Sequence, residues 1–233
     1  MSKIVCVFAH PDDEAFGPGG TIATYAKNHN VYLICATRGE QGNNDADANS
    51  ELAHIREKEL RESAKILGIQ NVYFMDFHDG TLSNNMYHQI ADGIEQIISP
   101  IQPEILLTYE QHGISGHLDH IAISMITTYV YKKLTFVKKL YYYCINKNIT
   151  PPVEDYFIYF PEGYSEKEIT TQINIEQVWD TKVQSMLAHR SQKSDAERIL
   201  ERSKNKPRID HFILAMHRLD NLKLPETDLL NGF

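Results

Sequence analysis

The sequence predicts an α/β fold: a Rossmann-like, mostly parallel sheet with helices on both faces, plus an irregular C-terminal extension. Three observations support this class. Short runs that are apolar throughout alternate with helical patterns, as expected for parallel strands buried on both faces. The 233 residues are enough for one large core. Chemically distinctive residues follow the expected strands, where α/β sheets bind ligands. We therefore expect a single domain, with residues 1–145 as the α/β core and residues 146–233 as a C-terminal elaboration.

The core is expected to begin with two strand–helix units. Ile4–Ala9 is a continuous apolar run, followed by a turn and a helix near Thr21–Asn28. Val31–Thr37 is rich in β-branched and aromatic residues, which favours a strand. Glu51–Leu67 is the clearest helix, because its apolar residues recur at helical spacing and Gly68 supplies a stop signal.

The same alternation continues to the end of the core. Strands are expected at Val72–Met75, Ile105–Tyr109 and Leu140–Ile145, with helices around Met86–Ile98 and from about Asp119 to Lys132.

The region beyond the core is less regular, and Thr150-Pro151-Pro152 indicates a break. The elements expected after it are an aromatic extended segment at Tyr156–Phe160, a strand at Thr170–Ile175, helices at Val178–His189 and Asp195–Ser203, and a last strand or helix at His211–His217.

The composition argues against several classes of protein. A formal net charge of −8 with scattered Lys and Arg residues argues against a nucleic-acid partner. No apolar stretch approaches the roughly 18–20 residues needed to cross a bilayer. The N-terminus lacks the cleavage site of a signal peptide, so a cytoplasmic location is expected. The three cysteines lie inside apolar runs and are expected to be buried thiols. The sequence does not define the oligomeric state, and a homo-oligomer is compatible with it.

The strongest chemical signal is His10-Pro11-Asp12-Asp13-Glu14, at the end of the first expected strand. One imidazole and three carboxyl groups within five residues are costly to bury without a cation. Imidazole with carboxylate is a normal set of zinc ligands. The alternative is an exposed acidic turn formed around Pro11, because Asp and Pro are common turn residues.

A second signal, Gly116-His117-Leu118-Asp119-His120, follows the fourth expected strand. His117 and His120 are spaced i and i+3 on the first turn of a helix and therefore share a face. In isolation, such a pair is read as two exposed histidines at a helix start. Together, the two clusters follow two strands at the same edge of one sheet. A catalytic zinc with three ligands and an open position needs that arrangement.

At these residues the sequence resembles the PIG-L/LmbE-like family of zinc-dependent N-acetylglucosaminyl deacetylases. The resemblance covers most of the first 145 residues. Its specific motifs are Ala9–Glu14 and Gly113–His120. Weaker matches are Thr37-Arg38-Gly39-Glu40, Ile55-Arg56-Glu57, Asp79-Gly80 and, more loosely, Ala188-His189-Arg190-Ser191-Gln192. One departure is Leu118, where the family usually has Pro; this changes the stiffness of the turn and not the ligand chemistry.

The resemblance implies a role for each matched residue. His10, Asp13 and His120 would be the zinc ligands, although Fe²⁺ or Co²⁺ also suits two nitrogens and one oxygen. Asp12 would be the general base, and His117 would stabilise the oxyanion or protonate the departing amine. The residues expected to contact the sugar are Glu14, Arg56 and Asp79. Without the resemblance, Arg56 is read as one half of a surface ion pair and Asp79 as part of an Asx turn.

The expected reaction removes an acetyl group from the amide nitrogen of a small N-acetylglucosamine-like conjugate. Zinc would lower the pKa of a bound water to about 7 and polarise the carbonyl, and Asp12 would take the proton of the water. Either Asp12 or His117 would then protonate the nitrogen. Two alternatives stay open: a metal-dependent esterase or phosphoesterase, and a non-catalytic metal- or sugar-binding protein. The long polar loop Arg38–Asn49 is expected to act as a specificity lid.

Overall fold

A computed structural model of the chain describes residues 1–42, 49–149 and 158–233. Within these residues, one sheet contains the strands in the order β3-β2-β1-β4-β5-β7-β6. Their bounds are β1 Lys3–Phe8, β2 Asn30–Thr37, β3 Asn71–Phe77, β4 Ile105–Tyr109, β5 Lys139–Cys144, β6 Thr171–Asn174 and β7 Ile209–His217. Strands β1 to β5 are parallel, whereas β7 is antiparallel to both of its neighbours.

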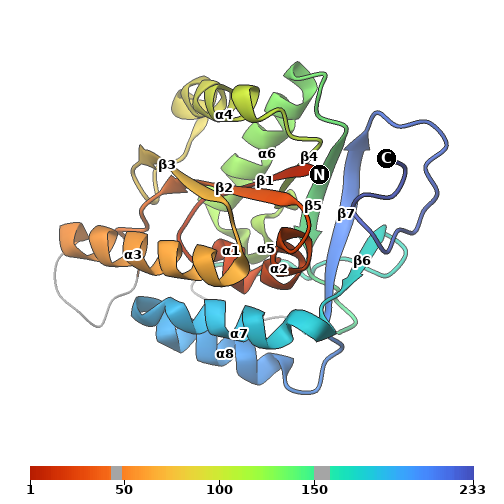
Figure 1. Cartoon of the computed structure of the whole chain (residues 1–233). Helices are drawn as coiled ribbons and strands as arrows, with labels where there is room; N and C mark the ends of the chain where they lie inside the picture. The colour runs from red at the N-terminus through yellow and green to blue at the C-terminus, as the bar shows by residue number, and fades with distance from the viewer. Residues whose placement is uncertain (43–48, 150–157) are drawn as a thin grey trace.

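Helices cover both faces of this sheet (Figure 1). Their bounds are α1 Asp13–Phe16, α2 Gly19–Ala26, α3 Asn49–Leu67, α4 Tyr87–Ile101, α5 Gly113–Gly116, α6 Leu118–Lys133, α7 Trp179–Ala188 and α8 Lys193–Ser203. Helices α4 and α6 lie on one face; α2, α3 and α7 lie on the other, with α8 packed against α7. The predicted α/β class, with a mostly parallel sheet and helices on both faces, is confirmed.

The central strands show why the sequence folds this way. Every residue of Ile105–Tyr109 is buried, and so are the last five residues of Lys3–Phe8. Apolar side chains on both sides of a strand are stable only where helices cover both faces. The outer strand β3 is half-buried along most of its length. The most apolar strands therefore lie at the centre of the sheet, and the less apolar strand β3 lies at its edge.

The last third of the chain extends the same sheet. The segment His211–His217, which the sequence left as a strand or a helix, belongs to β7, and β7 pairs with β5 and β6. The C-terminal third therefore contributes strands to the same sheet as the core. The predicted break at Thr150-Pro151-Pro152, the start of Tyr156–Phe160 and half of the Arg38–Asn49 loop lie outside the described residues.

The structure also bears on the cysteines and on the length of the helices. Cys6, Cys35 and Cys144 are buried free thiols, as predicted. Among the described residues, no helix has the length and apolar character that a membrane span requires.

A buried ion pair fixes the C-terminal segment against β5. Nζ of Lys139 lies 2.5 Å from Oε1 of Glu226, and both side chains are fully buried. The same ammonium group donates to the carbonyl oxygen of Leu229 at 3.1 Å. The hydroxyl of Tyr141 donates to the second carboxylate oxygen of Glu226 at 2.7 Å. Because all these polar groups are satisfied by one another, the segment closes the edge of the core without leaving a buried charge unpaired.

Candidate active site

The predicted site residues gather at the carboxyl ends of the parallel strands. The cavity there has a volume of about 930 Å³, within the range of about 300–1,000 Å³ typical of small-molecule sites. Seven of the eight predicted residues line it: His10, Asp12, Asp13, Arg56, Asp79, His117 and His120. The eighth, Glu14, is buried behind the cavity wall.

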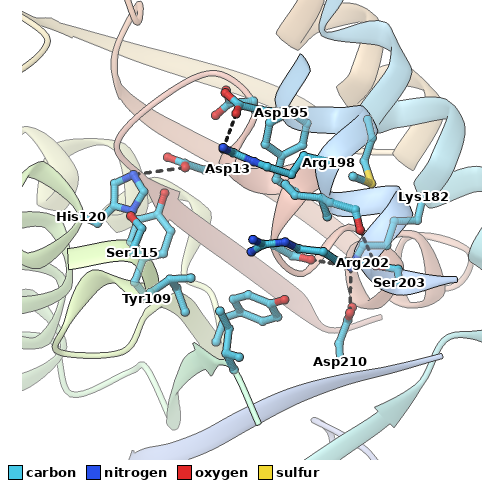
Figure 2. Close-up of a pocket in the computed structure, with 18 of the residues that line it drawn as sticks. Asp13, Tyr109, Ser115, His120, Lys182, Asp195, Arg198, Arg202, Ser203 and Asp210 are labelled. Carbon is cyan, nitrogen blue, oxygen red and sulfur yellow. Dashed lines mark hydrogen bonds and ion pairs between the residues drawn. The ribbon is translucent and has the colours of Figure 1, made fainter. Parts of the chain in front are cut away.

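His10, Asp13 and His120 converge on one point. Nδ1 of His10 lies 3.1 Å from Nε2 of His120, and Oδ1 of Asp13 lies 3.3 Å from the same nitrogen. The third separation, from Nδ1 of His10 to Oδ2 of Asp13, is 3.7 Å. His10 and Asp13 come from the turn after β1, and His120 comes from the first turn of α6. Figure 2 shows the side chains of Asp13 and His120 pointing toward each other, with a dashed line between them.

The other nitrogen of His10 is held by two carboxylates. Nε2 lies 2.9 Å from Oδ1 of Asp79 and 3.3 Å from Oδ2 of Asp119. Burial lowers the pKa of His10, but the hydrogen bonds to Asp119 and Asp79 outweigh burial and raise this pKa to about 10. Burial also acts to raise the pKa of Asp79, yet the hydrogen bond from His10 lowers it to about 2. The surrounding carboxylates therefore favour a positive charge at this point.

His120 is oriented from two sides. Its Nδ1 lies 2.9 Å from the carbonyl oxygen of Gly113, which leaves Nε2 to face His10 and Asp13. The ring of Tyr109 stacks on the imidazole with centroids 4.3 Å apart and an interplanar angle of 3°. Burial lowers the pKa of His120 to about 4, and the neighbouring His10 acts in the same direction. Nε2 of the neutral ring therefore presents a lone pair.

A buried glutamate shapes the loop that carries this carbonyl oxygen. Glu110 accepts hydrogen bonds from the backbone N–H groups of His112 at 2.7 Å and Ile114 at 2.6 Å. Ile114 has a φ of 63°, which is strained for a β-branched residue. Gly113 also has a positive φ, and a Cβ there would lie 2.8 Å from Cβ of His120. The carboxylate of Glu110 thus stabilises a backbone conformation that Ile114 would not adopt alone.

Asp12 lies beside the convergence point and is bound to Arg56. Oδ2 of Asp12 accepts from Nη2 of Arg56 at 2.9 Å, and the backbone of Asp12 has a φ of 123°. Arg56 also donates to the carbonyl oxygens of Pro11 at 2.5 Å and Gly39 at 2.8 Å. Burial raises the pKa of Asp12 to about 7 although Arg56 opposes it. Arg56 thus holds the turn that presents Asp12.

Glu14 supports this turn from inside. It accepts from the hydroxyl of Ser63 at 2.5 Å and lies 2.8 Å from Nε2 of His189. Its other oxygen accepts from the backbone N–H of Asp12 at 3.1 Å. These contacts place Glu14 behind Asp12, away from the space open to a ligand.

His117 occupies the entrance to α6. Its Nδ1 accepts from the backbone N–H of Asp119 at 3.2 Å, so in the neutral ring the proton resides on Nε2. Burial and the neighbouring His10 lower the pKa of His117, which favours the neutral form. Leu118 is the first residue of α6 and is 74% exposed. A first helical position accepts Pro or other residues equally well, so the departure at Leu118 does not displace the histidines.

The donor groups fit a divalent cation. Ligands at about 2.1 Å in tetrahedral geometry lie about 3.4 Å apart. Nδ1 of His10 and Nε2 of His120 are 3.1 Å apart, and the carboxylate of Asp13 lies 3.3 Å from His120 through Oδ1 and 3.7 Å from His10 through Oδ2. The hydrogen bond from Nε2 of His10 to a carboxylate is the usual support for a metal-binding histidine. Two overlapping groups also have donor atoms within 4.8 Å of one another: His10, His117 and His120, and His10, Asp79 and Asp119.

Sequence reasoning missed several residues that build the site. Asp119 has no role in the sequence prediction, yet it accepts from Nε2 of His10 and from the backbone N–H groups of Gly80 at 2.8 Å and Leu82 at 3.1 Å. Tyr109 is predicted only as the last residue of a strand, and Glu110 has no predicted role. The position of Asp119 between His117 and His120 is the one signal in the sequence, because its partners lie in the segments that follow β1 and β3.

Comparisons with known proteins place this geometry in context. A family model described as PIG-L, GlcNAc-PI de-N-acetylase, matches residues 5–131. The chain is 32% identical over 197 residues to the probable N-acetyl-α-D-glucosaminyl L-malate deacetylase 2 of Bacillus cereus, covering 81% of this chain and 83% of that protein. It is 28% identical over 227 residues to the 1D-myo-inositol 2-acetamido-2-deoxy-α-D-glucopyranoside deacetylase of Actinosynnema mirum, covering 82% and 80%.

A solved structure shares the fold. The N,N'-diacetylchitobiose deacetylase from Pyrococcus horikoshii aligns with a TM-score of 0.69 at 20% identity, covering 91% of this chain and 82% of that one.

Proposed function

The chain belongs to the PIG-L family, and we propose that it is a metal-dependent hydrolase that removes the acetyl group from the nitrogen of an N-acetylglucosamine conjugate. The named relatives are deacetylases of such conjugates, which supports this activity. The observation that carries the proposal for this chain is the convergence of two imidazole nitrogens, 3.1 Å apart, with the carboxylate of Asp13, whose Oδ1 lies 3.3 Å from His120 and whose Oδ2 lies 3.7 Å from His10.

We assign His10, Asp13 and His120 as the metal ligands and zinc as the metal. The assignment of Asp13 as the third ligand, in preference to His117, rests on the lone pairs. His117 accepts a backbone hydrogen bond through Nδ1, whereas Asp13 directs an oxygen at Nε2 of His120. Two nitrogens and one oxygen with an open fourth position are typical of catalytic zinc sites. Fe²⁺ and Co²⁺ would suit the same donors.

When bound, zinc supplies a water of lowered pKa and a Lewis acid for the amide carbonyl. Asp12 is the carboxylate next to the ligands that is free of a ligand role, and it acts as the general base that accepts the proton of the attacking water. Its hydrogen bond with Arg56 at 2.9 Å fixes the direction of its carboxylate. Proton transfer requires such fixed geometry, because a general base works only within hydrogen-bonding reach of its proton.

His117 acts on the other side of the substrate. With Nδ1 occupied by the backbone N–H of Asp119, its Nε2–H is a hydrogen-bond donor to the oxygen that becomes negative in the tetrahedral intermediate. The departing amine receives its proton from Asp12, or from His117 in its doubly protonated form, because a neutral His117 would be left as an imidazolate.

Three residues were expected to contact the sugar. Arg56 and Asp79 line the cavity, and we retain them as substrate contacts. Each also has a structural partner, Asp12 and His10 respectively. Glu14 does not line the cavity, and its hydrogen bonds to Ser63 and Asp12 favour a role in holding the general base.

The sugar conjugate is small. The relatives are named for malate and inositol conjugates of N-acetylglucosamine, and a cavity of about 930 Å³ accommodates a sugar with a substituent of that size. The cytoplasmic location stays a prediction, and the sequence does not define the oligomeric state.

The test combines metal analysis with amine release. Purified protein loaded with one equivalent of zinc should release free amine from N-acetylglucosaminyl malate or N-acetylglucosaminyl inositol, and removal of the metal by a chelator should abolish this release. The result that contradicts the proposal is hydrolysis of ester or phosphoester substrates with no amine release from any N-acetylated sugar.

A further inference from the structure

The cavity continues from the metal-ligand cluster to helix α8. Asp195, Arg198 and Arg202, spaced three and four residues apart, line it from one face of the helix, and Lys206 lines it from the segment beyond. Figure 2 shows the side chains of Arg198 and Arg202 pointing into the cavity, toward the side on which Asp13 and His120 lie. This end of the cavity lies in the C-terminal third, outside the residues 5–131 that match the family model.

Two of the three acidic residues of α8 lie away from the cavity. Glu197 and Glu201 do not line it and pair instead with Lys193, at 3.6 Å, and with Lys204. The cavity face carries two arginines, Arg198 and Arg202, and one carboxylate, Asp195.

The acidic residues at this end already have cationic partners. Asp195 accepts from Arg198 at 2.5 Å, and Asp210 lies 2.9 Å from Nζ of Lys182. Among the described residues, this end of the cavity is lined by these two carboxylates and by five cations, Lys182, Arg198, Arg202, Lys206 and Arg208. A wall with more cations than carboxylates favours an anionic ligand.

Two further observations support this. Burial lowers the pKa of Lys206, and the positive charge of Arg202 lowers it further, so the two cations lie within reach of each other. Arg208 is held over the ring of Trp179, 3.6 Å from its centroid, and donates to the carbonyl oxygen of Ser203 at 2.7 Å. Arg208 and Trp179 therefore form a fixed part of the wall at this end.

We propose that Arg198, Arg202 and Lys206 bind a carboxylate or phosphate group on the aglycone, so that the enzyme prefers N-acetylglucosamine conjugates that carry an oxyanion over neutral ones. Guanidinium groups bind such oxyanions through paired hydrogen bonds, and a concave site concentrates their field. The inference rests on the proposed function, because it takes the sugar to be deacetylated at the metal-ligand cluster. The residues of the cavity near α8 determine only which conjugates bind.

The first test compares four substrates that share the sugar. N-acetylglucosaminyl malate carries carboxylates, N-acetylglucosamine 1-phosphate carries a phosphate, and N-acetylglucosaminyl inositol and methyl N-acetylglucosaminide are neutral. We expect kcat/KM to be at least roughly 10-fold higher for one or both anionic substrates, since a charge-assisted hydrogen bond is worth about that factor. Whichever anionic substrate has the higher kcat/KM identifies carboxylate or phosphate as the group that the α8 residues bind. Equal values for anionic and neutral substrates would overturn the inference.

Substitutions then assign the effect to α8. Arg202→Gln and the double variant Arg198→Gln/Lys206→Gln should lower kcat/KM roughly 10- to 100-fold for the anionic substrate, mainly through KM, and should change the neutral substrates less than about threefold. Lys204→Gln is the matched control: it removes the same charge from the same segment but from a residue that does not line the cavity. A loss of equal size in Lys204→Gln, or for neutral substrates, would contradict the assignment.

A binding measurement keeps the inference testable without catalysis. Trp179 is the only tryptophan, and it lines this end of the cavity. Titration of the zinc-loaded protein with N-acetylglucosaminyl malate and with N-acetylglucosamine 1-phosphate should change its fluorescence, with an apparent Kd that rises with ionic strength and in Arg202→Gln. If binding is observed without amine release, the proposed reaction fails and the inference stands. If no anionic conjugate binds more tightly than methyl N-acetylglucosaminide, the inference fails.

Discussion

Asp79 holds the ring of His10 through a contact of 2.9 Å between Oδ1 and Nε2. The contact fixes Nε2 at the inner side of the imidazole and leaves Nδ1 directed at His120, 3.1 Å away. Carboxylates that orient a metal-binding histidine in this way raise its affinity for the metal. We therefore infer that Asp79 increases the affinity for the metal by orienting His10.

The variant Asp79→Ala should weaken zinc binding by roughly 10- to 100-fold, because Nε2 of His10 loses the nearer of its two carboxylate acceptors. Competition with a chromophoric chelator measures the change. Asp92→Ala serves as the control, since this carboxylate is on α4 and its side chain is 62% exposed. Equal zinc affinities in the two variants would show that Asp79 does not orient a ligand.

Replacement of the general base should separate catalysis from metal binding. Asp12→Asn keeps the shape of the side chain and removes its ability to accept a proton. We expect kcat to fall by a factor of roughly 10²–10⁴ while the zinc content stays near one per chain. Steady-state kinetics and metal analysis on the same preparation test this. Near-normal kcat in a zinc-loaded Asp12→Asn would remove Asp12 from the mechanism.

Asp13 and His117 compete for the role of third ligand, and two variants distinguish them. Asp13→Ala should lose zinc, because two imidazoles alone do not make a stable site. His117→Ala should retain zinc and lose kcat, because its Nε2–H is proposed to stabilise the oxyanion. Metal-to-protein ratios after dialysis give the answer. The reverse pattern, zinc lost in His117→Ala and kept in Asp13→Ala, would favour the cluster of His10, His117 and His120.

The buried pair at the C-terminal segment predicts a stability effect independent of the metal. Glu226→Gln leaves the ammonium of Lys139 buried without its counter-charge, which should lower the free energy of unfolding by about 3–5 kcal/mol. Glu62→Gln removes a partner of Arg190 from a pair whose side chains are 46% and 67% exposed, and it should cost less than about 1 kcal/mol. Urea unfolding of the metal-free variants measures both, and similar values would refute the prediction.

The sequence predicted the fold and the position of the site because both depend on local pattern. Apolar runs without alternation identify parallel strands, and the strand-end rule then brings the turn at His10 and the helix at His120 to one edge. Ile105–Tyr109 was predicted with the bounds that the structure has. The strand β7 was ambiguous, because a short apolar run has no period that separates strand from helix.

The rest of the site depends on contacts between distant segments. Asp119 binds His10 across 109 residues of sequence, and Glu14 meets His189 across 175 residues. Neither pairing leaves a trace in local spacing. The cations of α8 were equally hidden, because alternating charges on a helix are typical of a solvated surface. Only the packing of α8 beside the cavity shows which face is directed inward.

The most direct test of the account is anomalous diffraction at the zinc edge from crystals of the zinc-loaded protein. The account predicts one strong peak at about 2.0–2.2 Å from Nδ1 of His10, a carboxylate oxygen of Asp13 and Nε2 of His120. A peak coordinated instead by His10, Asp79 and Asp119, or no peak between His10 and His120, would contradict it.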